Sequence, residues 1–382
     1  MQKQIQTRPQ TQHKKSVDAF VIGGGPSGLA AAIALRRKGI SVVVADAAQP
    51  AIDKACGEGL MPDALASLAQ MGIHPPREMG APFRGICFRD AHTSTSAAAY
   101  FPQGTGLGMR RTLLHQWLLE QAQDAGATLL WGTQVDLRDP ETLFAHGTAW
   151  QAKWIIGADG QNSRVRQIAG LDHAARTQRF GFRQHFSITP WNDCVEVYWA
   201  DGGQAYVTPI GASEICVALI VEDKHFRLAE IDRLFPMLAE RLRGHLPSTH
   251  ERGALTLCRS LPRVTRGNIA LIGEASGSVD AITGEGLALS FQQALALAEA
   301  ISIGDLSQYE ARHHQISSVS TRMSSLLVFL GRHPHLQAKV LRAFQKDASV
   351  FSHMLAVHLG AQSLLRISPR SLCQFGWNWV TA

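Results

Sequence analysis

The 382-residue sequence lacks the long apolar segments of membrane and secreted proteins. No uninterrupted apolar run approaches the 18 residues that suggest a membrane-spanning helix. The first sixteen residues are rich in Gln, Lys and Thr and have no apolar core of the kind that a secretory signal needs. We therefore expect a cytoplasmic protein in which residues 1–16 form a disordered polar arm.

Paired cysteines and blocks of charge are also absent. The six cysteines lie far apart, with no Cys-x-x-Cys pair and no zinc-ligand spacing, so we expect reduced thiols and no metal site. The adjacent His313 and His314 point in different helical directions and do not change this expectation. Lys and Arg total 37 against 31 Asp and Glu, with no block of five like charges. This balance mildly favours anionic ligands, and we predict no nucleic-acid partner.

Glycine is plentiful, and its arrangement in residues 17–35 predicts a nucleotide-binding unit. An apolar strand runs into Gly23, Gly25 and Gly28, which have Gly-x-Gly-x-x-Gly spacing, and an alanine-rich helix follows. Gly23 allows the tight turn, Gly25 lets backbone amides approach a pyrophosphate, and Gly28 allows close packing of helix on strand. Asp46 ends the next apolar run, where an acid can bind ribose hydroxyls.

Two further glycine-centred turns follow apolar strands. One is Gly157-Ala-Asp-Gly after residues 154–156, and the other is Gly273-Glu-Ala after residues 268–272. Between them, residues 194–199, 204–209 and 214–221 alternate with turn signals and predict an antiparallel meander. Arg110 and Arg111 begin a predicted helix and oppose its dipole, which indicates that an acid or ligand compensates them.

Helical patterns dominate the chain after about residue 305. In residues 336–346, Leu336, Val340 and Phe344 share one face, while basic residues lie on another. Such a helix can lie on a membrane surface or pack on the protein with its charged face in water. Both alternatives stay open from the sequence.

The three glycine turns together resemble the three signatures of the flavoprotein monooxygenases related to p-hydroxybenzoate hydroxylase. The same scaffold is shared by geranylgeranyl reductases and flavin-dependent halogenases, and the resemblance covers residues 17–305. It implies bound FAD and an α/β fold with α+β insertions. The expected parts are a Rossmann-like FAD-binding domain (17–80, 103–175 and 255–305), an antiparallel-sheet substrate domain (81–102 and 176–254) and a helical C-terminal region (306–382).

The resemblance also implies roles for individual residues. Asp46 would hold the adenosine ribose, and Arg111 the ribityl and pyrophosphate region. Asp159 would structure the middle turn, and Glu274 stands where the family usually has Asp. The full set of predicted cofactor-binding residues is Gly23, Gly25, Pro26, Ser27, Gly28, Asp46, Arg111, Asp159, Gly160, Gly273, Glu274, Gly284, Gly286 and Leu287. The last three would bring backbone N–H groups at a helix N-terminus near the flavin ring.

The leading functional hypothesis is a monooxygenase that uses NAD(P)H, O2 and FAD to hydroxylate a small, secondary-metabolite-like substrate through a C4a-hydroperoxide. Only one dinucleotide fingerprint exists, so NAD(P)H would bind transiently. Cys56 is the candidate catalytic residue, and Tyr206 and Thr208 are candidates for the substrate pocket. The halogenase signature Trp-x-Trp-x-Ile-Pro is absent.

Two alternatives stay open. The segment Cys56-Gly57-Glu58-Gly59 resembles the Cys-Gly loop of geranylgeranyl reductases, which favours a reductase that saturates C=C bonds of a prenyl or other lipid-like substrate. Peripheral membrane contact would suit that substrate. A third hypothesis is a flavin-dependent maturation partner of another protein. The sequence predicts neither the substrate nor the oligomeric state.

Overall fold

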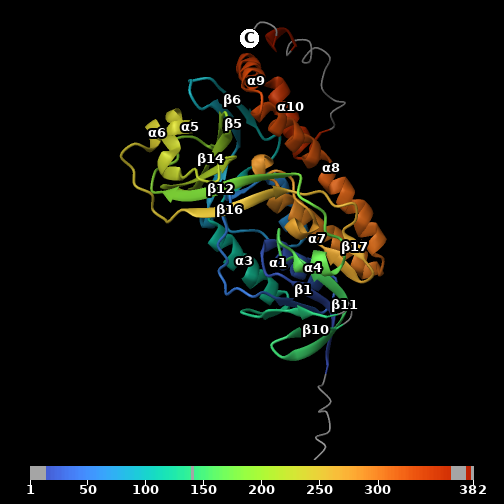
Figure 1. The fold of residues 1–382 in the computed structure, drawn as a ribbon. Coiled ribbons are helices and arrows are strands. Elements are labelled where there is room, and N and C mark those ends of the chain that lie inside the picture. The colour runs from blue at the N-terminus through green and yellow to red at the C-terminus, as the bar shows by residue number, and fades with distance from the viewer. Residues whose placement is uncertain (1–13, 139–141, 363–375, 380–382) are drawn as a thin grey trace, which may run out of the picture.

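The computed structural model describes residues 14–138, 142–362 and 376–379. Most of the predicted polar arm lies outside the described residues, and its last two residues already belong to strand β1 (Lys15–Ile22). Figure 1 shows two sheet-containing lobes with helices of the C-terminal region running along one side of both. The boundaries of the predicted domains stay a prediction.

The first lobe is built on a mainly parallel sheet. Its strand order is β17 (Thr265–Arg266), β18 (Ile269–Leu271), β11 (Thr148–Gly157), β1, β2 (Val42–Ala45) and β8 (Thr128–Leu130), with β10 (Thr142–Ala145) and β9 (Asp136–Leu137) attached to β11. Only β17 and the β9–β10 extension run antiparallel. The carboxyl ends of β1, β2, β11 and β18 lead into the loops that carry Gly23, Asp46, Asp159 and Gly273. Parallel pairing therefore brings all of these loops to one edge of the sheet.

Helices cover this sheet because their apolar faces are buried on it. They are α1 (Pro26–Arg37), α2 (Pro62–Gln70), α3 (Arg111–Asp124), α4 (Arg164–Ile168) and α7 (Gly286–Ile303). In the described part of the chain, α7 alone is long and apolar enough to cross a membrane, and half of it is buried inside the protein. It packs against α1, α2 and α8 (Leu306–Gly331) as a core helix.

The second lobe is a seven-stranded sheet. Its order is β16 (Arg252–Cys258), β12 (Thr177–Phe186), β15 (Glu214–Val221), β14 (Gly203–Gly211), β13 (Cys194–Ala200), β5 (Gly85–Asp90) and β6 (Ser96–Tyr100). The predicted meander is confirmed as β13, β14 and β15. A small third sheet joins β3 (Gly59–Leu60), β7 (Gly106–Gly108) and β4 (Ala81–Phe83). The glycines at 104–108 thus belong to a bend and to strand β7.

Both faces of the second sheet are covered. On one face, Phe182, Tyr198 and Val217 pack against residues of η2 (Leu228–Glu230), α5 (Ile231–Leu234) and α6 (Pro236–Leu242). On the other face, Val197, Trp199 and their neighbours meet α8 (Leu306–Gly331). The remaining short helices are η1 (Arg77–Met79), η3 (Gly273–Ser276) and η4 (Ala281–Thr283).

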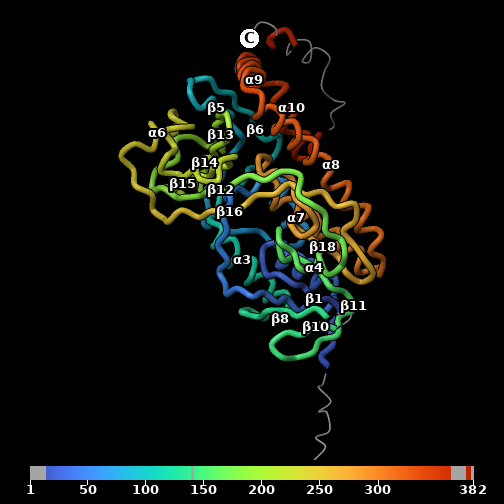
Figure 2. Tube along the Cα trace, in the orientation of Figure 1, coloured from blue at the N-terminus to red at the C-terminus, as the bar shows by residue number. Residues whose placement is uncertain are grey.

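The C-terminal helices connect the two lobes. The Tyr309 hydroxyl of α8 donates to the Leu271 carbonyl at 2.7 Å, which fastens this helix to the parallel sheet. Farther along, α9 (Pro334–Lys346) and α10 (Ser349–His358) pack on β6, with Phe344 and Phe351 stacked at 5.0 Å between ring centroids. The tube in Figure 2 follows this path past both sheets. The apolar face of α9 therefore packs against the protein itself.

Candidate active site

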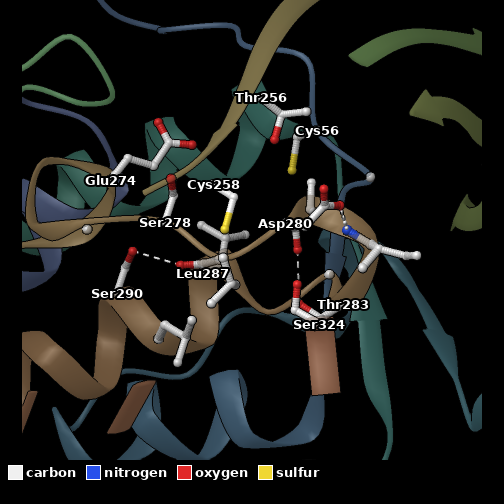
Figure 3. A pocket seen from close by; sticks show the side chains of 18 of the residues that line it. Cys56, Thr256, Cys258, Glu274, Ser278, Asp280, Thr283, Leu287, Ser290 and Ser324 are labelled. Carbon is white, nitrogen blue, oxygen red and sulfur yellow. Dashed lines mark hydrogen bonds between the residues drawn. The ribbon is translucent and has the colours of Figure 1, made fainter. Parts of the chain in front are cut away.

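A cavity of about 1570 Å³ lies between the two sheets and the C-terminal helices. All predicted cofactor-binding residues except Gly28 line it, and so do Cys56, Tyr206 and Thr208. Figure 3 shows Cys56, Glu274 and Leu287 among the side chains around this cavity. The structure thus gathers the predicted residues around one space, while their individual roles stay predictions.

The β1–α1 turn leaves room for a ligand at one point only. Gly23 has φ +113°, and a Cβ there would lie 2.3 Å from the Ala158 carbonyl oxygen. Gly28 packs beneath the turn, where a Cβ would lie 1.9 Å from the Gly23 oxygen. At Gly25, which lines the cavity, no atom lies within 4 Å of a Cβ position. The open space at the start of α1 suits a phosphate.

Asp46 shapes the same end of the cavity. Its Oδ2 accepts a hydrogen bond from the Gly24 amide at 2.7 Å, and its Oδ1 accepts one from the Ala48 amide at 2.8 Å. The carboxylate is therefore held in one orientation beside the glycine turn. Each carboxylate oxygen keeps a second acceptor position that a ribose hydroxyl can use.

Two buried polar atoms, in residues that line the cavity near the glycine turn, have no hydrogen-bond partner among the described residues. Asp159 accepts from the Arg164 and Val165 amides through Oδ2, at 2.7 and 3.2 Å, but its buried Oδ1 has none. The buried Nε of Arg111 also lacks a partner. Unpaired buried polar atoms are uncommon in proteins. Asp159 and Arg111 both line the cavity, and an unpaired acceptor and an unpaired donor within its wall fit a large polar cofactor such as FAD.

The opposite wall comes from the loops after β18. Glu274 forms an ion pair with Lys54, which also lines the cavity. Gly284 and Gly286 stand at the start of α7, and no atom lies within 4 Å of a Cβ position at either. The N-terminus of α7 thus presents backbone amides and a positive dipole to free space. That environment stabilises negative charge on a bound group.

Glu58 holds the loop that carries Cys56. Its side chain is 3% exposed; Oε1 accepts from the Arg111 amide at 2.9 Å, and Oε2 lies 2.7 Å from Nε2 of His185. Glu58 is therefore the acid that compensates the start of α3, while Glu214 pairs with Arg110. The arginines predicted a compensating group, but nothing in the sequence identified which acid it is.

The same neighbourhood brings three metal-ligating residue types together. Ligand atoms of Glu58, His185 and Cys216 lie within 4.8 Å of one another, a grouping that the cysteine spacing did not reveal. Burial raises the pKa of the Cys216 thiol well above its usual value, so the sulfur stays protonated. Arg183 Nε lies 3.8 Å from Glu58. With a guanidinium this close, the cluster is organised as an ion pair.

The far end of the cavity is apolar. The residues contributed by β5, β13, β14 and β15 carry no charge: Ile86, Phe88, Val195, Val197, Trp199, Tyr206, Thr208, Ala218, Leu219 and Ile220. This apolar wall is completed by Leu327, Val328 and Leu330 of α8, Val340, Leu341 and Phe344 of α9, and Phe351, Met354 and Leu355 of α10. Nearer its start, α8 also lines the cavity with Ser and Thr side chains and with Arg322. The Tyr206 hydroxyl donates to the Ile282 carbonyl at 3.1 Å, and burial raises its pKa far above the usual value.

Comparisons with known proteins agree with this geometry. The model of a family described as "FAD binding domain" matches residues 16–209, half of the chain. Menaquinone reductase of Mycobacterium tuberculosis is 26% identical over 82% of this chain and 85% of its own. Digeranylgeranylglycerophospholipid reductase of Methanosarcina mazei is 27% identical over 77% and 78%. The crystal structure of p-nitrophenol 4-monooxygenase PnpA from Pseudomonas putida superposes with a TM-score of 0.76 at 18% identity, covering 91% of this chain and 98% of that one.

Proposed function

Because the chain belongs to the FAD-binding-domain family and is an FAD-dependent oxidoreductase, we propose that it reduces a C=C bond in a substrate with a long apolar chain. The observation that carries the proposal is the uncharged wall formed by β5, β13, β14 and β15 and continued by the apolar side chains of α8, α9 and α10. Such a wall removes a long hydrocarbon chain from water, which is favourable in proportion to the apolar area buried.

This proposal reverses the order of the two enzyme hypotheses from the sequence. The motifs alone favour a monooxygenase, whereas the apolar wall and the two reductase relatives favour reduction. Both relatives are named for substrates that are lipids. The Cys56 loop, which resembles the reductase loop, lines the cavity.

The residues divide the work between the two ends of the cavity. The glycine turn, Asp46 and Arg111 would hold FAD, and the N-terminus of α7 would stabilise negative charge on its ring. When bound, FAD supplies hydride-transfer chemistry, which protein side chains do not offer, and NAD(P)H would be the transient donor. The second sheet and the C-terminal helices bind the substrate and exclude water. Cys56 contacts the reacting part of the substrate.

Product mass tests the proposal. The purified protein, loaded with FAD, is incubated without oxygen with NADPH or NADH and a polyprenyl quinone or a geranylgeranyl lipid. We expect a product that stays heavier by two hydrogens after re-oxidation in air, because air returns any quinol to the quinone but leaves a saturated C=C bond unchanged. A product heavier by one oxygen, formed only in air, would replace this proposal with oxygen transfer.

A small-molecule monooxygenase is the second candidate. The observation that favours it is the set of three glycine motifs, which resemble those of the monooxygenases. A cavity that excludes water would protect an oxygen-transfer step. It predicts substrate-stimulated NAD(P)H oxidation that consumes O2 in equal amount. An oxygen electrode with aromatic and lipid substrates in parallel separates the two candidates.

A further inference from the structure

Two buried titratable side chains face each other beside the cavity and have no role in the description so far. Glu285 lies between Gly284 and Gly286 at the start of α7, and His358 is the last residue of α10 and lines the cavity. Nε2 of His358 lies 3.1 Å from Oε1 of Glu285, and the side chains are 8% and 3% exposed. The pair joins the C-terminal helices to the turn that is predicted to hold the flavin.

Each member of the pair keeps one buried atom without a partner among the described residues. These atoms are Oε2 of Glu285 and Nδ1 of His358. If the pair only held α7 and α10 together, the contact between Nε2 of His358 and Oε1 of Glu285 would be sufficient. Ser320 and Thr283 lie close enough to shift the pKa values of the pair, but neither forms a hydrogen bond of normal geometry with these two atoms. Burying the pair with so little hydrogen bonding costs stability, which indicates that the site serves another purpose.

The surroundings keep both groups uncharged near neutral pH. Burial, with a smaller contribution from the Asp63 carboxylate of α2, raises the pKa of Glu285 to about 8, although the Ser320 and Thr283 hydroxyls oppose this shift. Burial lowers the pKa of His358 to about 4, against a backbone interaction with Thr283. The Glu285 carboxyl therefore donates its proton to Nε2, and the imidazole carries its own proton on Nδ1.

We propose that Glu285 and His358 form a proton relay that supplies the proton needed when the substrate C=C bond is reduced. The inference rests on the proposed reduction. One alkene carbon receives a hydride equivalent that comes from NAD(P)H, and the other receives the proton from Nδ1 of His358. The Glu285 proton moves to Nε2 in the same step, which leaves a Glu285 carboxylate and a neutral imidazole. Water then returns one proton to the pair.

The relay predicts a specific dependence of the rate on pH. The carboxyl must be protonated to act, so substrate reduction should be maximal below pH 8 and fall as the pH rises through the Glu285 pKa of about 8. Asp63 and His358 are the other titratable groups that face Glu285, and His358 stays neutral across this range. The decline should therefore follow a single group.

Glu285→Gln is the decisive variant because the amide fills the same space but provides no acid. We expect substrate reduction to fall about 100-fold, a usual contribution of general acid catalysis, and the alkaline decline to disappear. Glu299→Gln makes the same chemical change at the exposed surface of α7, where Glu299 pairs with Lys38, and should behave as wild type. A Glu285→Gln variant with the wild-type rate and pH profile would overturn the relay.

A second measurement tests the pair without any substrate. Nitrogen-15 NMR of the FAD-free chain should show His358 neutral at pH 7 with its proton on Nδ1, and Glu285→Gln should change this signal. A charged His358, or a proton on Nε2, would overturn the relay. If the NMR result is as expected but no polyprenyl substrate is reduced by the wild type, the proposed reduction has failed and the relay would lack its step, so the inference would be withdrawn with it.

Discussion

At the scale of single residues, the contacts of Glu58 explain how the Cys56 loop keeps its place. One buried carboxylate accepts from the Arg111 amide and pairs with His185, so it ties the loop to α3 and to β12. Removing it would leave the start of α3 without its acid and Arg183 with Asp53 as its remaining acidic partner. The loop that is predicted to contact the substrate is thus supported from behind.

We expect Glu58→Ala to lower the free energy of unfolding by about 3 kcal/mol, the usual cost of removing one member of a buried ion pair. Glu58→Gln should cost less, because its amide oxygen can still accept from the Arg111 amide. Urea unfolding followed by circular dichroism measures both. Glu299→Ala at the surface provides the comparison and should change stability by about 0.5 kcal/mol or less. Equal stability of Glu58→Ala and wild type would show that the cluster does not support the fold.

Cys56 provides the second prediction at this scale. If its thiol contacts the reacting part of the substrate, Cys56→Ala should lower kcat/KM about tenfold, which corresponds to about 1.4 kcal/mol of lost transition-state binding. The flavin absorbance should be unchanged. Cys258→Ala is the matched control, because Cys258 is also free and lines the same cavity. Equal losses in the two variants would contradict a specific role for Cys56.

At the scale of elements, two glycines of the β1–α1 turn have different roles. Gly23 is needed for folding, and Gly25 leaves space for the cofactor. Gly25 has φ −67° and ψ 175°, which a valine can adopt, and a Cβ there meets only open space. We expect Gly25→Val to fold normally but to purify without FAD, because its side chain fills the space for a phosphate. The ratio of flavin to protein absorbance and the Tm measure the two effects.

Gly23→Ala should behave in the opposite way. A Cβ at Gly23 would meet the Ala158 oxygen at 2.3 Å, and its φ of +113° strains any other residue. We expect a loss of stability of about 1–3 kcal/mol or more, seen as a lower Tm of the FAD-free protein. If Gly25→Val were the less stable of the two, the assignment of the open space would be wrong.

At the scale of the whole molecule, the cavity exists because three separate parts of the chain meet. The parallel sheet carries the predicted FAD residues, the second sheet provides the uncharged wall, and α8 to α10 close it. The resemblance to p-hydroxybenzoate hydroxylase relatives with geranylgeranyl reductase features is confirmed by the family match and by the relatives. The predicted α/β fold with its antiparallel insertion is confirmed as well.

This arrangement predicts that shortening the apolar end of the cavity lowers kcat/KM more for long substrates than for short ones. Ala218 lies on β15 in the apolar wall and is 7% exposed. Ala218→Trp should shorten the apolar end and lower kcat/KM for a four-isoprene substrate at least about tenfold more than for a one-isoprene substrate. The FAD content should be unchanged. An equal effect on both substrates would show that the chain does not extend along this wall.

The sequence by itself determined the local units of the protein. The strand, glycine turn and helix at the first motif, the acid Asp46 and the three segments of the meander could all be predicted, because periodicity and turn chemistry are properties of neighbouring residues. The two arginines at the start of α3 predicted that an acid or a ligand compensates their charge. The sequence did not identify Glu58 and Glu214 as the acids that do so. The family resemblance joined these units to one cofactor.

Only the tertiary structure decided which distant residues meet. Glu58 and His185 are 127 positions apart, and Glu285 and His358 come from helices with two others between them. No periodicity encodes such pairs, since they depend on how sheets and helices pack after they form. The same packing decided that the face of α9 with Leu336, Val340 and Phe344 turns to the protein and closes an apolar cavity. The choice between oxygen transfer and C=C reduction depends on that wall more than on any motif.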